Sequence, residues 1–345
     1  MNRMIFFPLP LTADFEDLDY RESKVYHPRR TGHDKNFKSL YRFSRRNVNF
    51  LANTFLNEYN EKRGGALDNI HKMKCLLRYL GDPGFQVGVG EDLGIHQSTV
   101  CKTIWSVAKK VASKASDWIK FPQNYEDFEQ EKKIWHQKYK FPSAIGAIDC
   151  THVAIKRPHI FHEEYVNRKG VTTFNVQATC NGAELFTSVD CRWVGSVHDA
   201  RIWRNSGIRN LVAENLSGAI LLGDEAYPLT PWLMTPFKKA ETVRQKAYNK
   251  LHSQERVIIE RLFGQVKQRF PILQSKIRLS TDKIPTVIIA CFVLHNVAKF
   301  LNDDDFAEDL DNIPDILTNT GQDTENLNII ERGKRRRDVI SSYLS

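Results

Sequence analysis

Two short apolar runs in the middle of the chain each lead to an aspartate. Ala144–Ile148 is followed by Asp149, and Ala219–Leu222 is followed by Gly223 and Asp224. Unbroken apolar runs of this length predict buried strands. We therefore expect two core strands that each place a carboxylate at a strand end.

A helical pattern follows the second run. In ERVIIERLFGQVKQRF, residues 255–270, the apolar residues fall on one side of a helix and Glu260 lies at the edge of that side. Arg256, Gly264 and Lys267 share the face of Glu260. The glycine leaves space beside the carboxylate, and the two cations suit a polyanionic ligand.

Gathered at one point, the three carboxylates of Asp149, Asp224 and Glu260 would suit Mg²⁺ or Mn²⁺, because hard cations prefer oxygen ligands. Two such ions can activate water and stabilise the leaving oxygen in phosphodiester cleavage. An aspartate at a strand end is also a common turn residue or helix cap, and this alternative stays open for each one.

The segment between the two runs predicts a hairpin and a helix. Thr172–Thr179 and Leu185–Val189 read as strands around Asn181-Gly182, a strong turn signal. Asp199 then opens a helix, where it either stabilises the helix dipole or joins the metal ligands as a fourth carboxylate. We favour a role beside the ligands, orienting His198 or Arg201. The fold class is α/β, a mixed sheet flanked by helices.

The first third of the chain is predicted to be helical. Val87–Leu93, Gly94 and Gln97–Lys110 resemble a helix-turn-helix, with Ser98 as a helix N-cap. Its inward stripe leaves five residues to face a DNA groove and its phosphates. These are Gln97, Thr99, Lys102, Thr103 and Lys110. An ordinary helical hairpin, or one used for dimerisation, is the alternative.

Four regions are expected. A flexible arm spans residues 1–35, a helical DNA-binding region spans 36–140, a nuclease domain spans 141–300, and an acidic flexible tail spans 301–345. Within the second region, Trp118–Lys140 reads as a solvated connecting helix. In the tail, Lys334–Arg337 is a short basic cluster that reads as a nuclear localisation signal or as a solvated helix face.

The charge is uneven over these regions. The whole chain of 345 residues carries +9. Residues 141–300 hold 21 basic and 13 acidic residues, whereas residues 301–345 hold 5 basic and 11 acidic residues. A basic body around an acidic cluster fits a polyanionic substrate held at a metal site. Arg168 and Lys169, in a polar connection, are further candidates for phosphate contact.

Several classes are disfavoured. The six cysteines show no CxxC spacing, so we expect reduced thiols rather than a disulfide frame or a zinc site. No Gly-rich phosphate loop indicates an NTPase, and no GxSxG elbow indicates a serine hydrolase. No apolar run approaches 18 residues and the opening segment is too short for a secretory signal, so we expect a soluble, intracellular protein without membrane contact.

Six motifs together resemble the PIF/Harbinger family of DDE transposases and their domesticated nuclease relatives. They are GAIDCTHVAI, YVNRKG, WVGSVHDARIWRNS, LLGDEAYPLTPWLMTPF, ERLFGQVKQRF and CFVLHN. The resemblance covers roughly residues 85–299 and departs from the family at Glu225, where a small residue is commoner. Glu225 adds a negative charge beside Asp224.

The resemblance implies an RNase H-like fold and a metal-binding triad of Asp149, Asp224 and Glu260, which some readings extend to Asp199. It implies a DNA endonuclease or transposase that cuts phosphodiester bonds with two Mg²⁺ or Mn²⁺ ions. It also implies nuclear localisation, with the cytoplasm open, and a Myb-like DNA-binding partner; a homo-oligomer is open too. The alternatives are a domesticated DNA-binding or scaffold protein that has lost catalysis, and an RNase.

Overall fold

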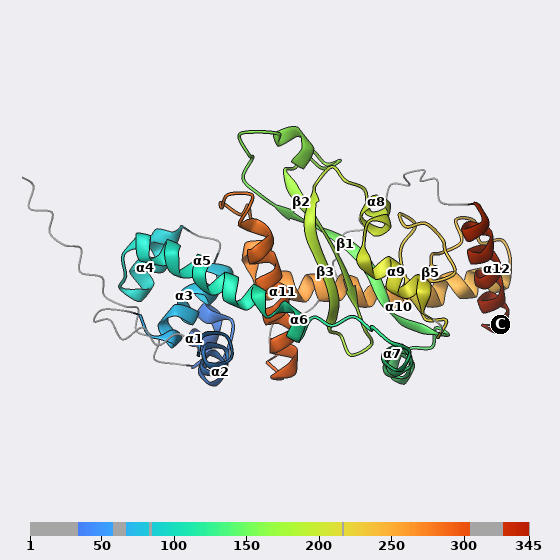
Figure 1. Cartoon of the computed structure of the whole chain (residues 1–345), viewed down its shortest axis with the longest axis horizontal. Helices are drawn as coiled ribbons and strands as arrows, with labels where there is room; N and C mark the ends of the chain where they lie inside the picture. Colours follow the sequence, from blue (N-terminus) through green and yellow to red (C-terminus); the bar gives the residue numbers. More distant parts are fainter. Residues whose placement is uncertain (1–33, 58–66, 83–84, 216, 304–326, 345) are drawn as a thin grey trace, which may run out of the picture.

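The computed structural model describes residues 34–57, 67–82, 85–215, 217–303 and 327–344. They form an elongated molecule, with the N-terminal helices at one end, the sheet in the middle and α12 (Leu327–Tyr343) at the other end (Figure 1). The flexible arm expected at 1–35 lies almost wholly outside the described residues, as does most of the acidic run after residue 303.

A mixed five-stranded sheet forms the centre, as the sequence predicts. The strand order is β3-β2-β1-β4-β5. The first three strands pair antiparallel, whereas β4 and β5 pair parallel to β1 and to each other. The strands are β1 (Ala144–Ala154), β2 (Thr173–Cys180), β3 (Phe186–Val194), β4 (Ile220–Leu222) and β5 (Leu233–Met234).

The expected hairpin joins β2 and β3. Asn181 begins the turn, and its side-chain carbonyl accepts hydrogen bonds from the backbone N–H groups of Ala183 and Leu185, both at 3.1 Å. This use of an asparagine side chain to close a turn explains why the Asn-Gly pair marks the position so clearly.

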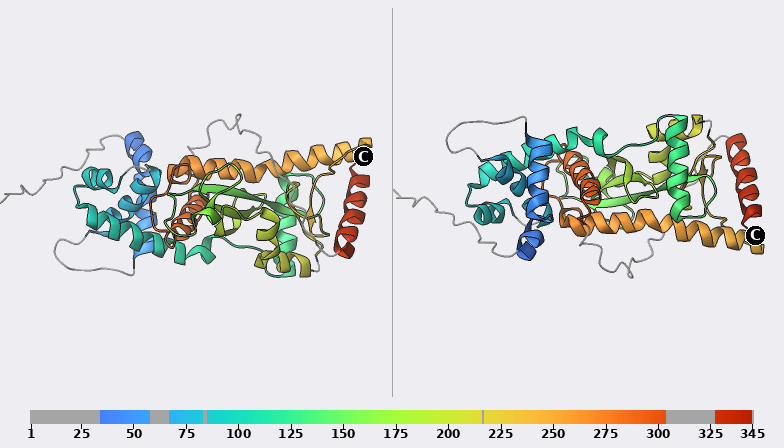
Figure 2. Two further views of the ribbon diagram at one scale, coloured as in Figure 1. Left: turned by 90° about the horizontal axis from the view of Figure 1, so that it is seen from above. Right: turned by 90° about the horizontal axis from the view of Figure 1, so that it is seen from below.

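Helices cover both faces of the sheet. On one face lie α10 (Val243–Arg269) and α11 (Ile284–Phe300), and α10 runs along much of the molecule (Figure 2). On the other face, α7 (Tyr125–Lys138), α8 (Asp199–Arg204) and α9 (Gly207–Glu214) contribute to a second apolar cluster. Two 3-10 turns, His162–Tyr165 and Pro271–Leu273, complete this part of the chain.

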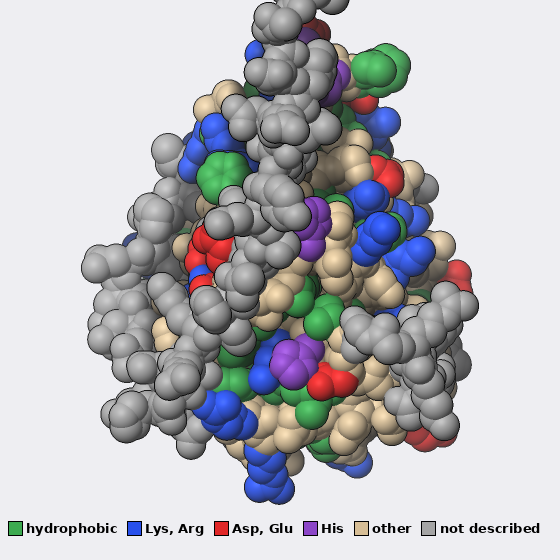
Figure 3. All heavy atoms as spheres, turned by 90° about the vertical axis from the view of Figure 1, so that its left-hand side faces the viewer, with side chains coloured by type: hydrophobic (Ala, Val, Ile, Leu, Met, Phe, Trp, Pro, Cys, Tyr) green, Lys and Arg blue, Asp and Glu red, His purple; other side chains and the backbone are tan. Residues whose placement is uncertain are grey.

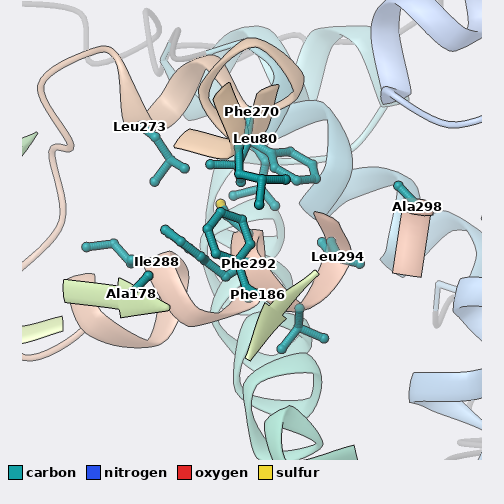
Figure 4. Close-up of a cluster of buried hydrophobic side chains, with 14 of the residues drawn as sticks. Leu80, Ala178, Phe186, Phe270, Leu273, Ile288, Phe292, Leu294 and Ala298 are labelled. Atoms are coloured by element: carbon teal, nitrogen blue, oxygen red, sulfur yellow. The ribbon is translucent and has the colours of Figure 1, made fainter. Parts of the chain in front are cut away.

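The N-terminal region is built from six helices. Val100, Ile104, Val107, Ala108 and Val111 of α5 are all buried, which confirms the predicted stripe. These helices share a core with the sheet: Figure 4 shows Leu80 of α3 beside Phe186 of β3 and Phe292 of α11. The helices are α1 (Asp34–Tyr41), α2 (Arg45–Leu56), α3 (Asn69–Gly81), α4 (Gln86–Leu93), α5 (Gln97–Ser113) and α6 (Ala115–Trp118).

Two local predictions in this region are wrong. The N-cap of α5 is His96, whose ring nitrogen accepts a hydrogen bond from the backbone N–H of Ser98 at 3.2 Å, so Ser98 lies inside the helix. The expected helix over Trp118–Lys140 is interrupted, and α7 begins only after Asn124. It is not a solvated connector either, because Phe128 and Trp135 are buried.

The C-terminal segment also differs from the expectation. Residues 327–343, expected in a flexible tail, form α12, which packs against α10 and β5. Half of the basic cluster is turned inward: Arg336 donates to the carbonyl oxygens of Pro231 and Gly218, and Arg337 donates to that of Pro236 at 3.0 Å. Within the described residues, no helix is long and apolar enough to span a bilayer.

A single buried carboxylate fixes α10 against the start of β1. The side chain of Glu255 accepts a hydrogen bond from the indole N–H of Trp135 at 2.9 Å. It also accepts from the backbone N–H groups of Lys140 at 2.6 Å and Phe141 at 3.0 Å. Since Glu255 precedes Arg256 and lies one turn before Glu260, this contact sets the position of the candidate site on α10.

We predict that Glu255→Ala destabilises the protein by about 2–4 kcal/mol, because three buried N–H donors lose their acceptor. Glu331→Ala is the matched control. Glu331 pairs only with Arg335 on the exposed surface of α12, and its loss should change stability by less than about 0.5 kcal/mol. Urea denaturation followed by circular dichroism measures both, and equal losses would contradict the structural role of Glu255.

Candidate active site

Asp149 and Asp224 lie on neighbouring parallel strands at the same level. Ala147 of β1 pairs with Leu222 of β4, so the same register continued by two residues sets Asp149 beside Asp224. Adjacent strands are about 4.8 Å apart. Asp149 lies within β1 rather than at a strand end as predicted, whereas Asp224 follows β4 directly.

Asp224 is buried, the side chain of Asp149 is 16% exposed, and the charge of Asp224 disfavours the charge of Asp149. Burial, and then the charge of Asp224, raises the pKa of Asp149 well above its usual range. Burial raises the pKa of Asp224 to about 6, although the nearby charge of Arg256 opposes the shift. Two desolvated carboxylates at one point form a site that favours a cation.

Arg256 and Glu260 face this pair from α10. One guanidinium nitrogen of Arg256 lies 3.4 Å from the Oδ2 atom of Asp149, and the other lies 2.6 Å from the Oε1 atom of Glu260. The side chain of Arg256 is only 17% exposed, so these ion pairs are well shielded from water. The guanidinium therefore links the first and third carboxylates of the predicted triad.

Lys267 approaches the same strand two turns further along α10. Its ammonium donates to the hydroxyl of Thr151 at 2.6 Å and to the backbone carbonyl of His152 at 3.3 Å. Burial lowers the pKa of Lys267 to about 8. Of the residues predicted to contact DNA, Arg256 and Lys267 thus point toward the sheet and the acidic pair.

Asp199 belongs to the opposite face of the sheet. Successive side chains in a strand alternate between faces, so Asp149 and Thr151 face α10 while Cys150 faces α8. Asp199 is the first residue of α8, and its Oδ1 atom accepts a hydrogen bond from the side-chain amide of Asn175 on β2 at 2.9 Å. Its charge still acts on the buried pair, because it raises the pKa of both Asp149 and Asp224.

The sequence did not predict a row of polar side chains, formed by Cys150, Tyr227 and Gln177, behind the acidic pair. The hydroxyl of Tyr227 lies 3.3 Å from the Sγ atom of Cys150 and accepts a hydrogen bond from the side-chain amide of Gln177 at 3.3 Å. Gln177 and Asn175 alternate along β2, and this spacing of amides in an otherwise apolar strand was the available signal. The row holds the turn after Asp224 against β1 and β2.

The remaining predicted DNA contacts lie in two places. The guanidinium of Arg168 donates to the ring of His198, and the neighbouring Lys169 is exposed. Gln97, Thr99 and Lys102 are exposed on α5, whereas Thr103 and Lys110 are half-buried there. Figure 3 views the end of the molecule where the N-terminal helices lie, and shows lysine and arginine side chains in several separate groups.

The donor chemistry of the acidic pair fits a hard divalent cation, since Asp149 and Asp224 offer carboxylate oxygens close together and Arg256 offsets only part of their charge. Glu260 is instead paired with Arg256. Accordingly, no group of three potential ligand side chains is assembled among the described residues. Asp149 and Asp224 lie close together, and the third carboxylate of the expected triad is held in an ion pair by Arg256.

Comparison with known families defines the class of protein. Residues 148–296 match the family described as "DDE superfamily endonuclease". The matched range contains Asp149, Asp199, Asp224 and Glu260. Residues 148–296 are thus similar to the DDE superfamily endonucleases, and a mixed sheet flanked by helices is consistent with that class.

Two individual relatives are similar to most of this chain. The human protein named "Putative nuclease HARBI1" is 28% identical over 271 residues, which cover 77% of this chain and 78% of that protein. The Arabidopsis thaliana protein named "Protein ALP1-like" is 26% identical over 294 residues, 78% of this chain and 72% of that protein. No solved structure is significantly similar to the chain. The resemblance to the Harbinger transposase-derived nucleases is confirmed.

We predict that Asp224→Asn stabilises the metal-free protein at pH 7.5 by up to about 3 kcal/mol, since one pKa unit corresponds to about 1.4 kcal/mol. The pKa of Asp224 rises from 3.8 to about 6 on folding, so its protonated form stabilises the fold fully below pH 4. This contribution is lost as the pH rises through about 6. Asparagine stays neutral throughout and still accepts the hydrogen bond from the N–H of Ala226.

Asp190→Asn is the control, for which we expect the opposite change in folding stability. Burial opposes the charge of Asp190, but hydrogen bonds from Arg192 and Trp193 outweigh burial and lower its pKa. This variant should be less stable than the wild type at pH 7.5, and the difference should vanish as the pH falls below the lowered pKa. Thermal melts in EDTA between about pH 2 and 8 measure both trends, because the contribution of Asp190 is lost only below its lowered pKa. A lower melting temperature for Asp224→Asn than for the wild type at pH 7.5 would contradict the conclusion that the charged form of Asp224 destabilises the fold.

Proposed function

We propose that this protein is a divalent-metal-dependent DNA endonuclease whose RNase H-like core hydrolyses phosphodiester bonds by a two-metal mechanism. One observation carries the proposal: two buried carboxylates, Asp149 and Asp224, stand side by side on parallel strands, with Glu260 on the helix that faces them. Such a site stabilises positive charge at a fixed point. The basic surroundings on α10 suit a nucleic-acid substrate.

Each residue has a distinct role in this proposal. Asp149 and Asp224 hold the metal ions, and Glu260 supplies the third carboxylate. These residues would hold Mg²⁺ or Mn²⁺, which would supply activation of water and stabilisation of the leaving oxygen. Asp199, held by Asn175 on the other face, orients the strands that carry the ligands. Lys267 fixes β1 through Thr151, and its charge favours the approach of phosphate.

A second candidate is a DNA-binding or scaffold protein that has lost catalysis. The observation that favours it is the ion pair of Arg256 with both Asp149 and Glu260, because an internal cation already neutralises part of the acidic cluster. The name of the Arabidopsis thaliana relative, "Protein ALP1-like", also states no enzymatic activity.

The N-terminal helices are proposed to bind DNA. Gly94 ends α4 in a left-handed conformation, with φ of 67°, and allows the tight turn into α5. In this arrangement α5 is the recognition helix of a helix-turn-helix, and Gln97, Thr99 and Lys102 face the groove. A Myb-like partner, a homo-oligomer and a nuclear location complete the proposal.

We predict that Asp149→Ala and Asp224→Ala each abolish nicking of supercoiled plasmid in Mg²⁺ or Mn²⁺, while DNA binding in EDTA is retained. The reason is that each substitution removes one of the two carboxylates already in place. The control is Asp117→Ala, which removes an exposed carboxylate on α6 and should leave nicking unchanged.

Two outcomes separate the candidate functions. Retention of more than about one-tenth of the wild-type nicking rate in either variant would refute the site assignment. Wild-type protein that binds DNA but does not nick it in either metal would favour the scaffold. A parallel assay with RNA distinguishes a ribonuclease.

We predict that Lys102→Ala/Lys110→Ala weakens duplex binding by the full chain and reduces its dependence on salt. Each lost phosphate contact should lower the slope of log K against log salt by about 0.9. Lys133→Ala, an exposed lysine on α7, is the control and should leave the slope unchanged. Fluorescence anisotropy at several salt concentrations measures this. An unaltered slope in the double variant would assign α5 to assembly instead.

A further inference from the structure

A cavity of about 590 Å³ opens between the turn that follows Asp224 and helix α12. One wall is formed by Glu225, Ala226 and Tyr227, which directly follow Asp224, and by Ala200, which follows Asp199. The opposite wall belongs to α12 and to the segment between β5 and α10. The cavity therefore shares the residues that position two of the candidate carboxylates.

Three lysines line this cavity without any compensating contact. Lys238 and Lys239 precede α10, and Lys334 projects from α12; all three are exposed. In the described part of the chain, none of them has a hydrogen-bond or ion-pair partner. Glu225 is the one acidic residue in the lining. The balance of charge favours an anionic ligand.

Arg337, the fourth cation of the lining, belongs to the wall itself. Its guanidinium lies 3.9 Å from the ring centroid of Phe237 and donates to the carbonyl of Pro236 at 3.0 Å. These contacts anchor α12 to the segment after β5. The position of Lys334 relative to Lys238 is thus set by packing and not by the lysines themselves.

A close helix contact supports the same geometry. A Cβ atom added at Gly333 would lie 3.0 Å from the backbone of Thr230, so only glycine lets α12 approach this closely without a shift. Gly333 immediately precedes Lys334. The sequence of α12 therefore brings a lysine to the rim of the cavity by a contact that a larger residue would obstruct.

Most of the remaining lining is apolar, although Thr235 and Tyr227 also contribute to it. Pro228, Leu229, Pro236 and Ile330 contribute surface that suits a flat, weakly polar group such as a base or sugar. Lysines at the rim and apolar walls inside match a nucleotide, whose phosphates are charged and whose base is not. A free phosphate alone would leave the apolar part unused.

We propose that this cavity binds a nucleotide of the substrate strand next to the scissile phosphate, with Lys238, Lys239 and Lys334 contacting its phosphates. The inference rests on the proposed function, because the strand cut at Asp149 and Asp224 is the ligand. It assigns α12 to substrate binding. The turn that carries Asp224 then has the reacting phosphate on one side and the neighbouring nucleotide on the other.

The test uses the full chain with Lys238→Ala/Lys334→Ala and, as matched control, Lys120→Ala/Lys133→Ala. Both double variants remove two exposed lysines, so net charge changes equally. Binding of a fluorescein-labelled single-stranded oligonucleotide is measured in EDTA, where no cleavage occurs. We expect affinity to fall at least tenfold in the cavity variant only, and the salt slope to fall by about 0.7 for each lost phosphate contact.

A second probe tests the apolar walls. Oligonucleotides with a single abasic site at successive positions should bind the wild type more weakly at one position, and the cavity variant equally at all positions. Equal binding by the two double variants would overturn the proposal even if Asp149→Ala abolishes nicking. A selective loss of binding, in a wild type that never nicks DNA, would uphold the cavity as a nucleotide site while refuting the nuclease.

Discussion

The burial of two like charges on adjacent strands is the constraint on which this structure depends. Asp149 lies in the central strand β1 and Asp224 lies just beyond the end of the neighbouring β4, where desolvation opposes the ionisation of both. A single helix provides cations that offset part of this charge: α10 places Arg256 beside Asp149 and Lys267 beside Thr151 of β1. The long α10 needs a firm anchor, and Glu255 provides it through three hydrogen bonds to the segment that enters β1.

Much of the core could be predicted because its signals are local. The apolar runs before Asp149 and Asp224 became β1 and β4, and the Asn-Gly turn placed the hairpin between β2 and β3. The stripe of α5 is buried as expected, because a helical period describes burial directly. Local signals failed where two neighbouring positions could each cap the helix, as at the start of α5, where His96 rather than Ser98 is the N-cap. They also failed at α7, whose charged surface hides the buried Phe128 and Trp135.

The candidate site was predictable in its residues but not in its pairings. Spacing along a helix puts Arg256 near Glu260, but it cannot reveal that the guanidinium also reaches Asp149 on a distant strand. The face on which Asp199 lies depends on the path of the chain after β3, and the amide of Asn175 in β2 does not by itself indicate that it binds Asp199. Contacts that join residues far apart in sequence require the tertiary structure, and they decide which carboxylates meet.

The shortest strand of the sheet has a consequence beyond the site. β5 spans only Leu233 and Met234 and forms one outer border of the sheet, where backbone groups would otherwise be open to pairing with another chain. Arg336 and Arg337 occupy carbonyl groups on either side of it, at Pro231 and Pro236, while α12 lies across the border. The C-terminal helix therefore covers this border of the sheet and protects it from pairing with the edge of another chain.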